Sequence, residues 1–125
     1  MSDNTSSSEP RLRLRIFFGD DVMLGPGKAD LLEHIRETGS IAAAGREMAM
    51  SYKRAWSLVE GMNRGYREPL VDSSRGGTKG GGASLTAAGE AVLAHYRKIE
   101  AITVREAADE IAALRAMLPD MSDGK

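Results

Sequence analysis

Residues 39–66 read GSIAAAGREMAMSYKRAWSLVEGMNRGY, and the rest of the chain is most easily understood from this segment. Two serines, Ser40 and Ser51, each stand directly before a run of residues with helical spacing. A serine side chain at an N-cap accepts a hydrogen bond from a free N–H group of the first turn, so we expect both serines to start helices. Only Ala49 and Met50 separate the first helix from the second cap. The segment therefore predicts two short helices joined by a tight turn.

The two predicted helices have different surfaces. The first contains small apolar residues such as Ala44, which allow a neighbouring element to pack closely. In the second, apolar residues at helical spacing predict a buried face, formed by Ala55, Leu58, Val59 and Met62. The polar and basic residues of the second helix and its cap can donate to phosphates or base edges; they are Ser51, Tyr52, Lys53, Arg54, Ser57 and Arg64. This pattern is typical of a helix-turn-helix whose second helix, from Ser51 to about Arg64, is the recognition helix.

A glycine-rich hairpin is predicted directly after the recognition helix. Two short strand signals, at residues 70–71 and 83–85, flank a segment in which five of the seven positions 76–82 are glycine. A hairpin in this position is the wing of a winged helix, because its glycines let backbone N–H groups approach phosphates. A flexible linker is the alternative interpretation of the same composition. If the segment is a wing, the side chains that it offers to DNA are Arg75, Thr78 and Lys79.

The segment before the helix-turn-helix predicts a strand, a turn and a helix. Residues 11–18 alternate between arginine and apolar side chains, as expected of a half-buried strand. The arginines could contact phosphates, but a solvated strand face is the favoured interpretation, because any exposed sheet face shows such alternating charge. We then expect a turn at 19–21, a short return strand at 22–24, a chain break at 25–27, and a helix from Ala29 to Arg36 that Gly39 ends.

The C-terminal part of the chain predicts a long amphipathic helix. Thr86 can cap a run whose apolar residues keep helical spacing as far as Leu118, a length of about 50 Å if the helix is unbroken. A helix that overhangs its own domain needs a partner for its apolar stripe, and a second copy of the chain is the simplest one. Thr103 and Val104 are both β-branched, so two consecutive helices remain an alternative.

Composition sets limits on the function. Without cysteine the chain has no disulfide and no thiolate metal site, and its formal net charge of -1 argues neither for nor against nucleic acid. The charge is unevenly distributed, however, with six Lys/Arg against three acidic residues in 51–82. There is no signal-peptide pattern and no long apolar run, so we expect a cytoplasmic protein without membrane contact.

No catalytic constellation is recognisable. Lys79 precedes Gly80 and is followed by a predicted strand, which is not the order of a phosphate-binding P-loop. The two histidines, His34 and His95, lie on separate predicted helices without acid–base spacing. Trp56 is interpreted as an anchor of helix packing. We therefore predict no enzyme activity and no cofactor or metal site.

Several of these residues together resemble the N-terminal DNA-binding domain of the ModE family of molybdate-responsive transcriptional regulators. The resemblance rests on a set of short motifs: Gly39-Ser40-Ile41, Ser51-Tyr52-Lys53, Ala55-Trp56, Met62-Asn63, and above all GGTKGGG at 76–82 followed by Leu85-Thr86 and Gly89. It extends from about Arg11 to the end of the C-terminal helix, and LysR-type regulators share a related domain. It implies a homodimeric winged helix-turn-helix that binds double-stranded DNA, at palindromic operators of molybdate-transport or molybdoenzyme genes.

The expected organisation has four parts. Residues 1–10 form a disordered arm, 11–85 the winged helix-turn-helix, 86–118 the helical dimerisation segment, and 119–125 a disordered tail, in a mainly α fold with a small β component. Regulators of the ModE family bind molybdate in β-barrel domains. No strand-rich segment follows Leu85 in this sequence, so no molybdate site can be assigned. We therefore expect a regulator that lacks these domains.

Two other functions are left open by the sequence. A winged helix can serve as a protein-interaction module that does not bind DNA. A stand-alone molybdate or tungstate sensor could instead use the N–H groups of the glycine-rich loop as an anion site.

Overall fold

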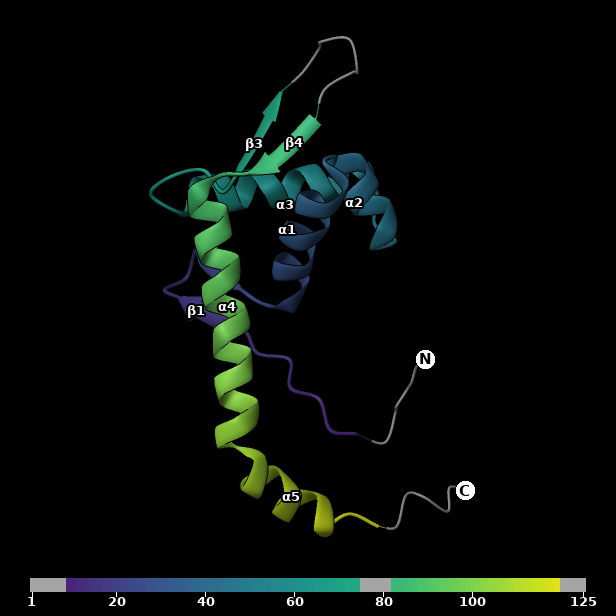
Figure 1. Ribbon diagram of the computed structural model, residues 1–125, viewed down its shortest axis with the longest axis vertical. Helices are drawn as coiled ribbons and strands as arrows, with labels where there is room; N and C mark the ends of the chain where they lie inside the picture. Colours follow the sequence, from purple (N-terminus) through teal and green to yellow (C-terminus); the bar gives the residue numbers. More distant parts are fainter. Residues whose placement is uncertain (1–8, 75–81, 120–125) are drawn as a thin grey trace.

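The computed structural model describes residues 9–74 and 82–119, and within these ranges the chain forms five helices and four short strands. In chain order these are β1 (Ile16–Phe18), β2 (Val22–Leu24), α1 (Pro26–Thr38), α2 (Ile41–Glu47), α3 (Tyr52–Gly65), β3 (Val71–Ser74), β4 (Gly82–Leu85), α4 (Ala87–Glu106) and α5 (Ala108–Ala116). Helices α1, α2 and α3 gather below the β3–β4 hairpin, and α4 runs away from them as a long rod (Figure 1). The prediction of a mainly α winged helix is confirmed.

The helix-turn-helix begins each of its helices as predicted. Ser40 and Ser51 are the N-caps of α2 and α3, and each hydroxyl oxygen accepts a 3.0 Å hydrogen bond from the backbone N–H three residues later. Between the helices, Ala49 has φ 58°, in the left-handed region that turns the chain sharply. The tight turn therefore costs some backbone strain, which the two caps help to offset.

The core lies between α1, the helix-turn-helix and the first half of α4. Leu31, Leu32 and Ile35 of α1 have no exposed surface, and Tyr96 of α4 is equally buried. The Tyr96 hydroxyl donates a 2.6 Å hydrogen bond to the backbone carbonyl of Leu14, which ties the N-terminal segment to α4. The predicted apolar face of α3 is confirmed, since Ala55, Val59 and Met62 are buried and Leu58 is half-buried.

An ion cluster joins α4 to α1. The guanidinium of Arg97 donates to Asp30 at 2.8 Å, to Glu33 at 2.7 Å and to Glu100 at 3.1 Å. Burial by itself lowers the pKa of Arg97, but the hydrogen bonds to the three carboxylates outweigh this effect and raise it above its ordinary value. Arg97 therefore stays charged and holds the two helices together.

The structure corrects the predictions for the first 40 residues. The predicted strand at 11–18 begins only at Ile16, because its partner β2 has three residues; residues 11–15 alternate in exposure as expected but have no strand partner among the described residues. The predicted chain break at 25–27 is wrong, since Pro26 is the first residue of α1, where a helix does not need the missing N–H. Helix α1 ends as predicted, with Gly39 at φ 72°.

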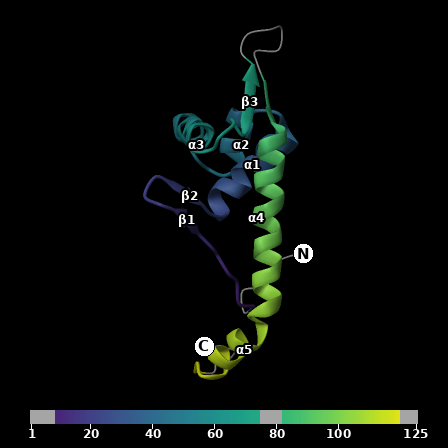
Figure 2. The same cartoon turned by 90° about the vertical axis from the view of Figure 1, so that its left-hand side faces the viewer.

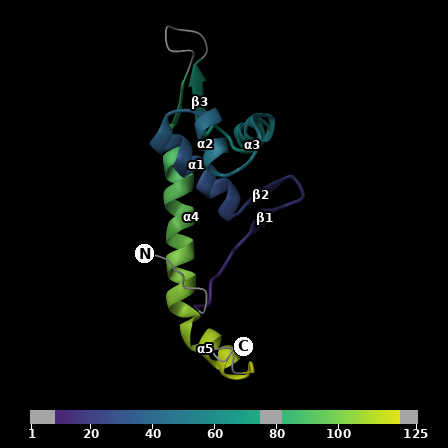
Figure 3. The ribbon, with the colours of Figure 1, turned by 90° about the vertical axis from the view of Figure 1, so that its right-hand side faces the viewer.

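The C-terminal helix is not continuous. Helix α4 ends at Glu106 and α5 begins at Ala108, so the alternative of two consecutive helices is correct. The Thr103 hydroxyl donates a 2.7 Å hydrogen bond to the carbonyl of Ile99, a contact that often bends helices. The backbone of Ala107 is no longer helical, with ψ at 4°. Figures 2 and 3 show α5 turning away from the axis of α4, on the side where the other elements lie.

Candidate nucleic-acid interface

The recognition helix α3 presents the predicted polar residues to solvent. All of those in the described part of the chain are exposed, namely Ser51, Tyr52, Lys53, Arg54, Ser57 and Arg64. Each residue of an α-helix lies about 100° further round the axis than the one before it. Lys53, Ser57 and Arg64 therefore follow one line along the middle of the exposed face, opposite the buried residues. Tyr52 and Arg54 lie at the two edges of this face.

Ser51 has a structural role at the start of the interface. Its hydroxyl oxygen accepts from the backbone N–H of Arg54, which satisfies one of the free donors of the first turn of α3. The hydroxyl proton is still available to a DNA phosphate. Ser51 thus sets the start of the recognition helix, and a contact of this residue with DNA remains a prediction.

Glu60 is a member of the exposed face that was not among the predicted DNA contacts. It is exposed and lies one turn from both Ser57 and Arg64, within the same line of side chains. A carboxylate repels phosphates, but it can accept a hydrogen bond from the amino group of cytosine. The signal was present in the sequence, because Glu60 is the only acidic residue between Ser51 and Arg67.

Asn63 connects the recognition helix to the hairpin, a role that was not predicted for it. Its Oδ1 accepts from the backbone N–H groups of Leu70 at 2.9 Å and Val71 at 3.0 Å. Its Nδ2 donates to the carbonyl of Val71 at 3.1 Å. On the other strand, the N–H of Ala83 donates to the carbonyl of Gly39 at 2.9 Å. The base of the wing is therefore attached to both ends of the helix-turn-helix.

The described part of the wing is the paired base of the hairpin. Strands β3 and β4 are antiparallel, with Val71 opposite Leu85 and Ser74 opposite Gly82, and the hairpin projects beyond the helices (Figure 1). A hollow of about 300 Å³ beside it is lined by Gly39, Asp72, Ser74, Gly82, Ala83 and Ser84. The remaining predicted DNA contacts, Arg75, Thr78 and Lys79, lie outside the described residues, as does most of the glycine-rich tip.

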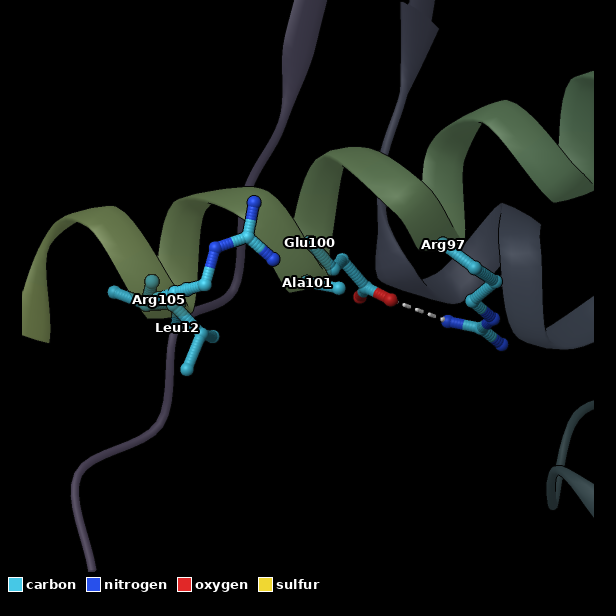
Figure 4. A pocket seen from close by; sticks show the side chains of 6 residues that line it. Leu12, Arg97, Glu100, Ala101 and Arg105 are labelled. Carbon is cyan, nitrogen blue, oxygen red and sulfur yellow. Dashed lines mark hydrogen bonds and ion pairs between the residues drawn. The ribbon is translucent and has the colours of Figure 1, made fainter.

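A second hollow, of about 550 Å³, lies between the N-terminal segment and α4. Figure 4 shows the side chains that line it. The lining residues are Leu12, Arg97, Glu100, Ala101, Val104 and Arg105. Arg97 and Glu100 are paired with each other here, and Arg105 lies 3.6 Å from the carboxylate of Glu106, so each charged group of the lining has an ion partner. Its remaining surface is mostly aliphatic, which distinguishes it from the basic face of α3.

Two further features bear on the kind of site. Among residues 9–74 and 82–119, no three His, Cys, Asp or Glu side chains come close enough to hold a metal ion. None of the helices in these ranges has the length and apolar character needed to cross a membrane.

A capped helix-turn-helix followed directly by an antiparallel hairpin defines the winged-helix class of proteins. No protein-family model matches the chain. It is, however, 42% identical over 104 residues to the molybdenum transport protein ModE of Azotobacter vinelandii, a match that covers 82% of this chain and 38% of that protein.

Other relatives agree with this match. The chain is 49% identical over 78 residues to the molybdenum-pterin-binding protein MopB of Rhodobacter capsulatus, covering 62% of this chain and 29% of the relative. It is 38% identical over 71 residues to the DNA-binding transcriptional dual regulator ModE of Escherichia coli K12, covering 57% and 27%. The homologues are thus ModE regulators and Mop proteins, and the predicted resemblance to a ModE-like domain is confirmed. The matched region spans only about a third of the length of these relatives.

Proposed function

We propose that this chain is a sequence-specific, DNA-binding transcriptional regulator that acts as a homodimer on genes of molybdate transport or molybdoenzymes. The observation that carries the proposal is the exposed face of α3, where the hydrogen-bond donors Lys53, Ser57 and Arg64 share one line with the acceptor Glu60, on a helix fixed by its cap. A helix of this kind fits the major groove of B-DNA. The names of the relatives, which refer to molybdenum and to transcriptional regulation, support the class of target genes.

The proposed contacts divide into two groups. Lys53, Ser57 and Arg64, with Tyr52 and Arg54 at the edges, face the base edges and the flanking phosphates of the major groove. The wing residues Arg75, Thr78 and Lys79 extend the contact to the sugar–phosphate backbone or the minor groove. Ser51 holds the first turn of α3 in place.

The proposed dimer rests on the apolar surface of the C-terminal helices. Within the described chain, α5 has no buried residue, while large apolar side chains remain exposed along α4, α5 and the residues just after it: Ile99, Ile102, Val104, Leu114, Met117 and Leu118. Large apolar side chains left exposed in this number along adjoining helices favour a partner that covers part of them. A second copy related by a two-fold axis would also place two recognition helices on half-sites about 34 Å apart.

Binding to DNA is tested by fluorescence anisotropy with duplexes that the wild-type protein selects from a random library, compared with scrambled duplexes. We expect the affinity to fall by about 10³-fold between 50 and 200 mM salt, because phosphate contacts release counterions. Lys53→Ala should weaken binding to the selected duplex by about 1 to 3 kcal/mol if Lys53 contacts a base.

The matched control is Lys98→Ala, which removes an exposed lysine of α4 that lies outside the proposed interface. An equal loss for both variants would contradict the assignment of α3 as the interface. Absence of any preferred duplex would contradict the proposed function and favour a protein-interaction module. The same titration with and without molybdate tests whether the ion affects binding.

The dimer gives a separate expected result. In sedimentation equilibrium, the wild-type protein should have twice the 13.4 kDa mass of one chain. Leu114→Glu should shift the population towards monomer, because Leu114 of α5 is 65% exposed in the single chain and a charge there would be buried in the dimer. Ala112→Glu, an exposed position on the opposite side of α5, is the control. A wild-type monomer at high concentration would contradict the proposal.

A further inference from the structure

Two aromatic side chains stand one turn apart at the beginning of the recognition helix. The rings of Tyr52 and Trp56 meet edge to face, with their centroids 6.1 Å apart and an angle of 75° between their planes. Tyr52 is 58% exposed, whereas Trp56 is half-buried and packs against the core. The pair therefore links an exposed side chain of the interface to a fixed part of the fold.

The indole of Trp56 is not explained by core packing alone. Its Nε1 is buried and has no acceptor among the described residues. A buried donor without a partner opposes folding, and an aliphatic side chain would fill the same space without this penalty. What the indole offers beyond aliphatic packing is an aromatic surface for the ring of Tyr52.

Tyr52 lies where orientation matters most. It is in the first turn of α3, and the first residues of a recognition helix are those that reach base edges. Its side chain is exposed, so its hydroxyl is accessible to DNA. An exposed tyrosine side chain would normally sample several rotamers. A contact to a phosphate can form from several of them, whereas a contact to one base edge requires a single orientation.

We infer that Trp56 is a positioning residue for DNA sequence recognition, which acts by holding the ring of Tyr52 against one base edge of the major groove. The inference rests on the proposed function and adds a determinant of specificity to it. The ring can contact the methyl group of thymine, and the hydroxyl can hydrogen-bond to a neighbouring base. Trp56 itself does not contact DNA in this arrangement.

The test compares binding to a selected duplex with binding to a scrambled duplex, using the full chain. We expect Trp56→Leu to lower the ratio of the two affinities by about 2- to 12-fold, which is the interaction energy of an edge-to-face aromatic pair expressed as a ratio of affinities. The affinity for the scrambled duplex should be unchanged. Trp56→Phe keeps an aromatic ring and should restore most of the ratio. In the background of Tyr52→Leu, the change of Trp56 to leucine should have no further effect on the ratio.

The outcomes separate this inference from the proposed function. If the wild-type protein prefers no duplex, both fail. If the wild-type protein has a preference and Trp56→Leu retains it, or weakens both duplexes equally, only the role of Trp56 is overturned.

A second measurement applies if thermal melting shows that Trp56→Leu does not fold. Tyr52 is exposed, so Tyr52→Leu leaves the core intact and tests the same contact from its other side. It should lower the affinity ratio at least as much, and it should change the response of Trp56 fluorescence to the selected duplex. Trp56 is the single tryptophan of the chain, so the signal is specific. An unchanged ratio in Tyr52→Leu would overturn the inference.

Discussion

Gly89→Ala is expected to destabilise the fold by about 2 to 4 kcal/mol, the sum of an overpacking cost and a lost hydrogen bond. Gly89 lies in the first turn of α4, and a Cβ atom there would run into the backbone carbonyl of Leu70. That carbonyl accepts a 2.9 Å hydrogen bond from the N–H of Thr86, so it cannot move away without breaking the junction between the wing and α4. Because the position of a Cβ atom is fixed by its backbone and the carbonyl is itself a backbone group, no side-chain rotation relieves the clash.

The matched control is Gly61→Ala, in the middle of α3. A Cβ atom at Gly61 would meet no atom within 4 Å, so this change should stabilise the protein by about 0.5 to 1 kcal/mol through helix propensity. Both variants are measured by urea unfolding followed by circular dichroism, with the free energy of unfolding taken from the linear extrapolation. Similar stabilities of the two variants would show that the contact with Leu70 does not constrain the junction.

Asn63→Ala is the second change with a large expected effect, about 2 to 4 kcal/mol in the free energy of unfolding. It removes three hydrogen bonds and leaves the N–H groups of Leu70 and Val71 without the acceptor that they share. Since these bonds attach the base of the wing to the recognition helix, affinity for DNA should fall as well. The loss in affinity should exceed the loss expected from the folded fraction alone.

Asn63→Asp separates the two functions of the amide. The aspartate retains an oxygen for the N–H groups of Leu70 and Val71 but cannot donate to the carbonyl of Val71, so we expect a smaller loss of stability than for Asn63→Ala. Urea unfolding and fluorescence anisotropy on the same preparations give both quantities. If Asn63→Ala is as stable as the wild-type protein, the amide does not hold the wing in place.

The features that were predictable from the sequence depend on neighbours along the chain. The caps at Ser40 and Ser51 and the buried face of α3 follow from hydrogen bonds and side-chain spacing within one or two helical turns. The wing strands follow from the same kind of local signal, although β3 and β4 extend further towards the tip than predicted. The caps and the helix face involve residues three or four positions apart, and strand signals depend on residue types within a short segment, so the order of residue types is sufficient to recognise them.

The resemblance to ModE was also recognisable at this level, because its motifs are short and contiguous. The DNA contacts assigned to the residues of α3 and the wing remain predictions, and those of the wing lie outside the described chain.

The remaining features depend on which elements come to lie side by side. The contact of Gly89 with the carbonyl of Leu70 joins residues from different elements, and so does the attachment of the wing through Asn63. Their partners are chosen by packing, which residue order alone does not specify.

The same applies to the start of α1 at Pro26 and to the break at Ala107, where local signals allowed more than one structure. Several backbone conformations are close in energy over a few residues there. The contacts of each segment with the assembled core and with solvent select one of them.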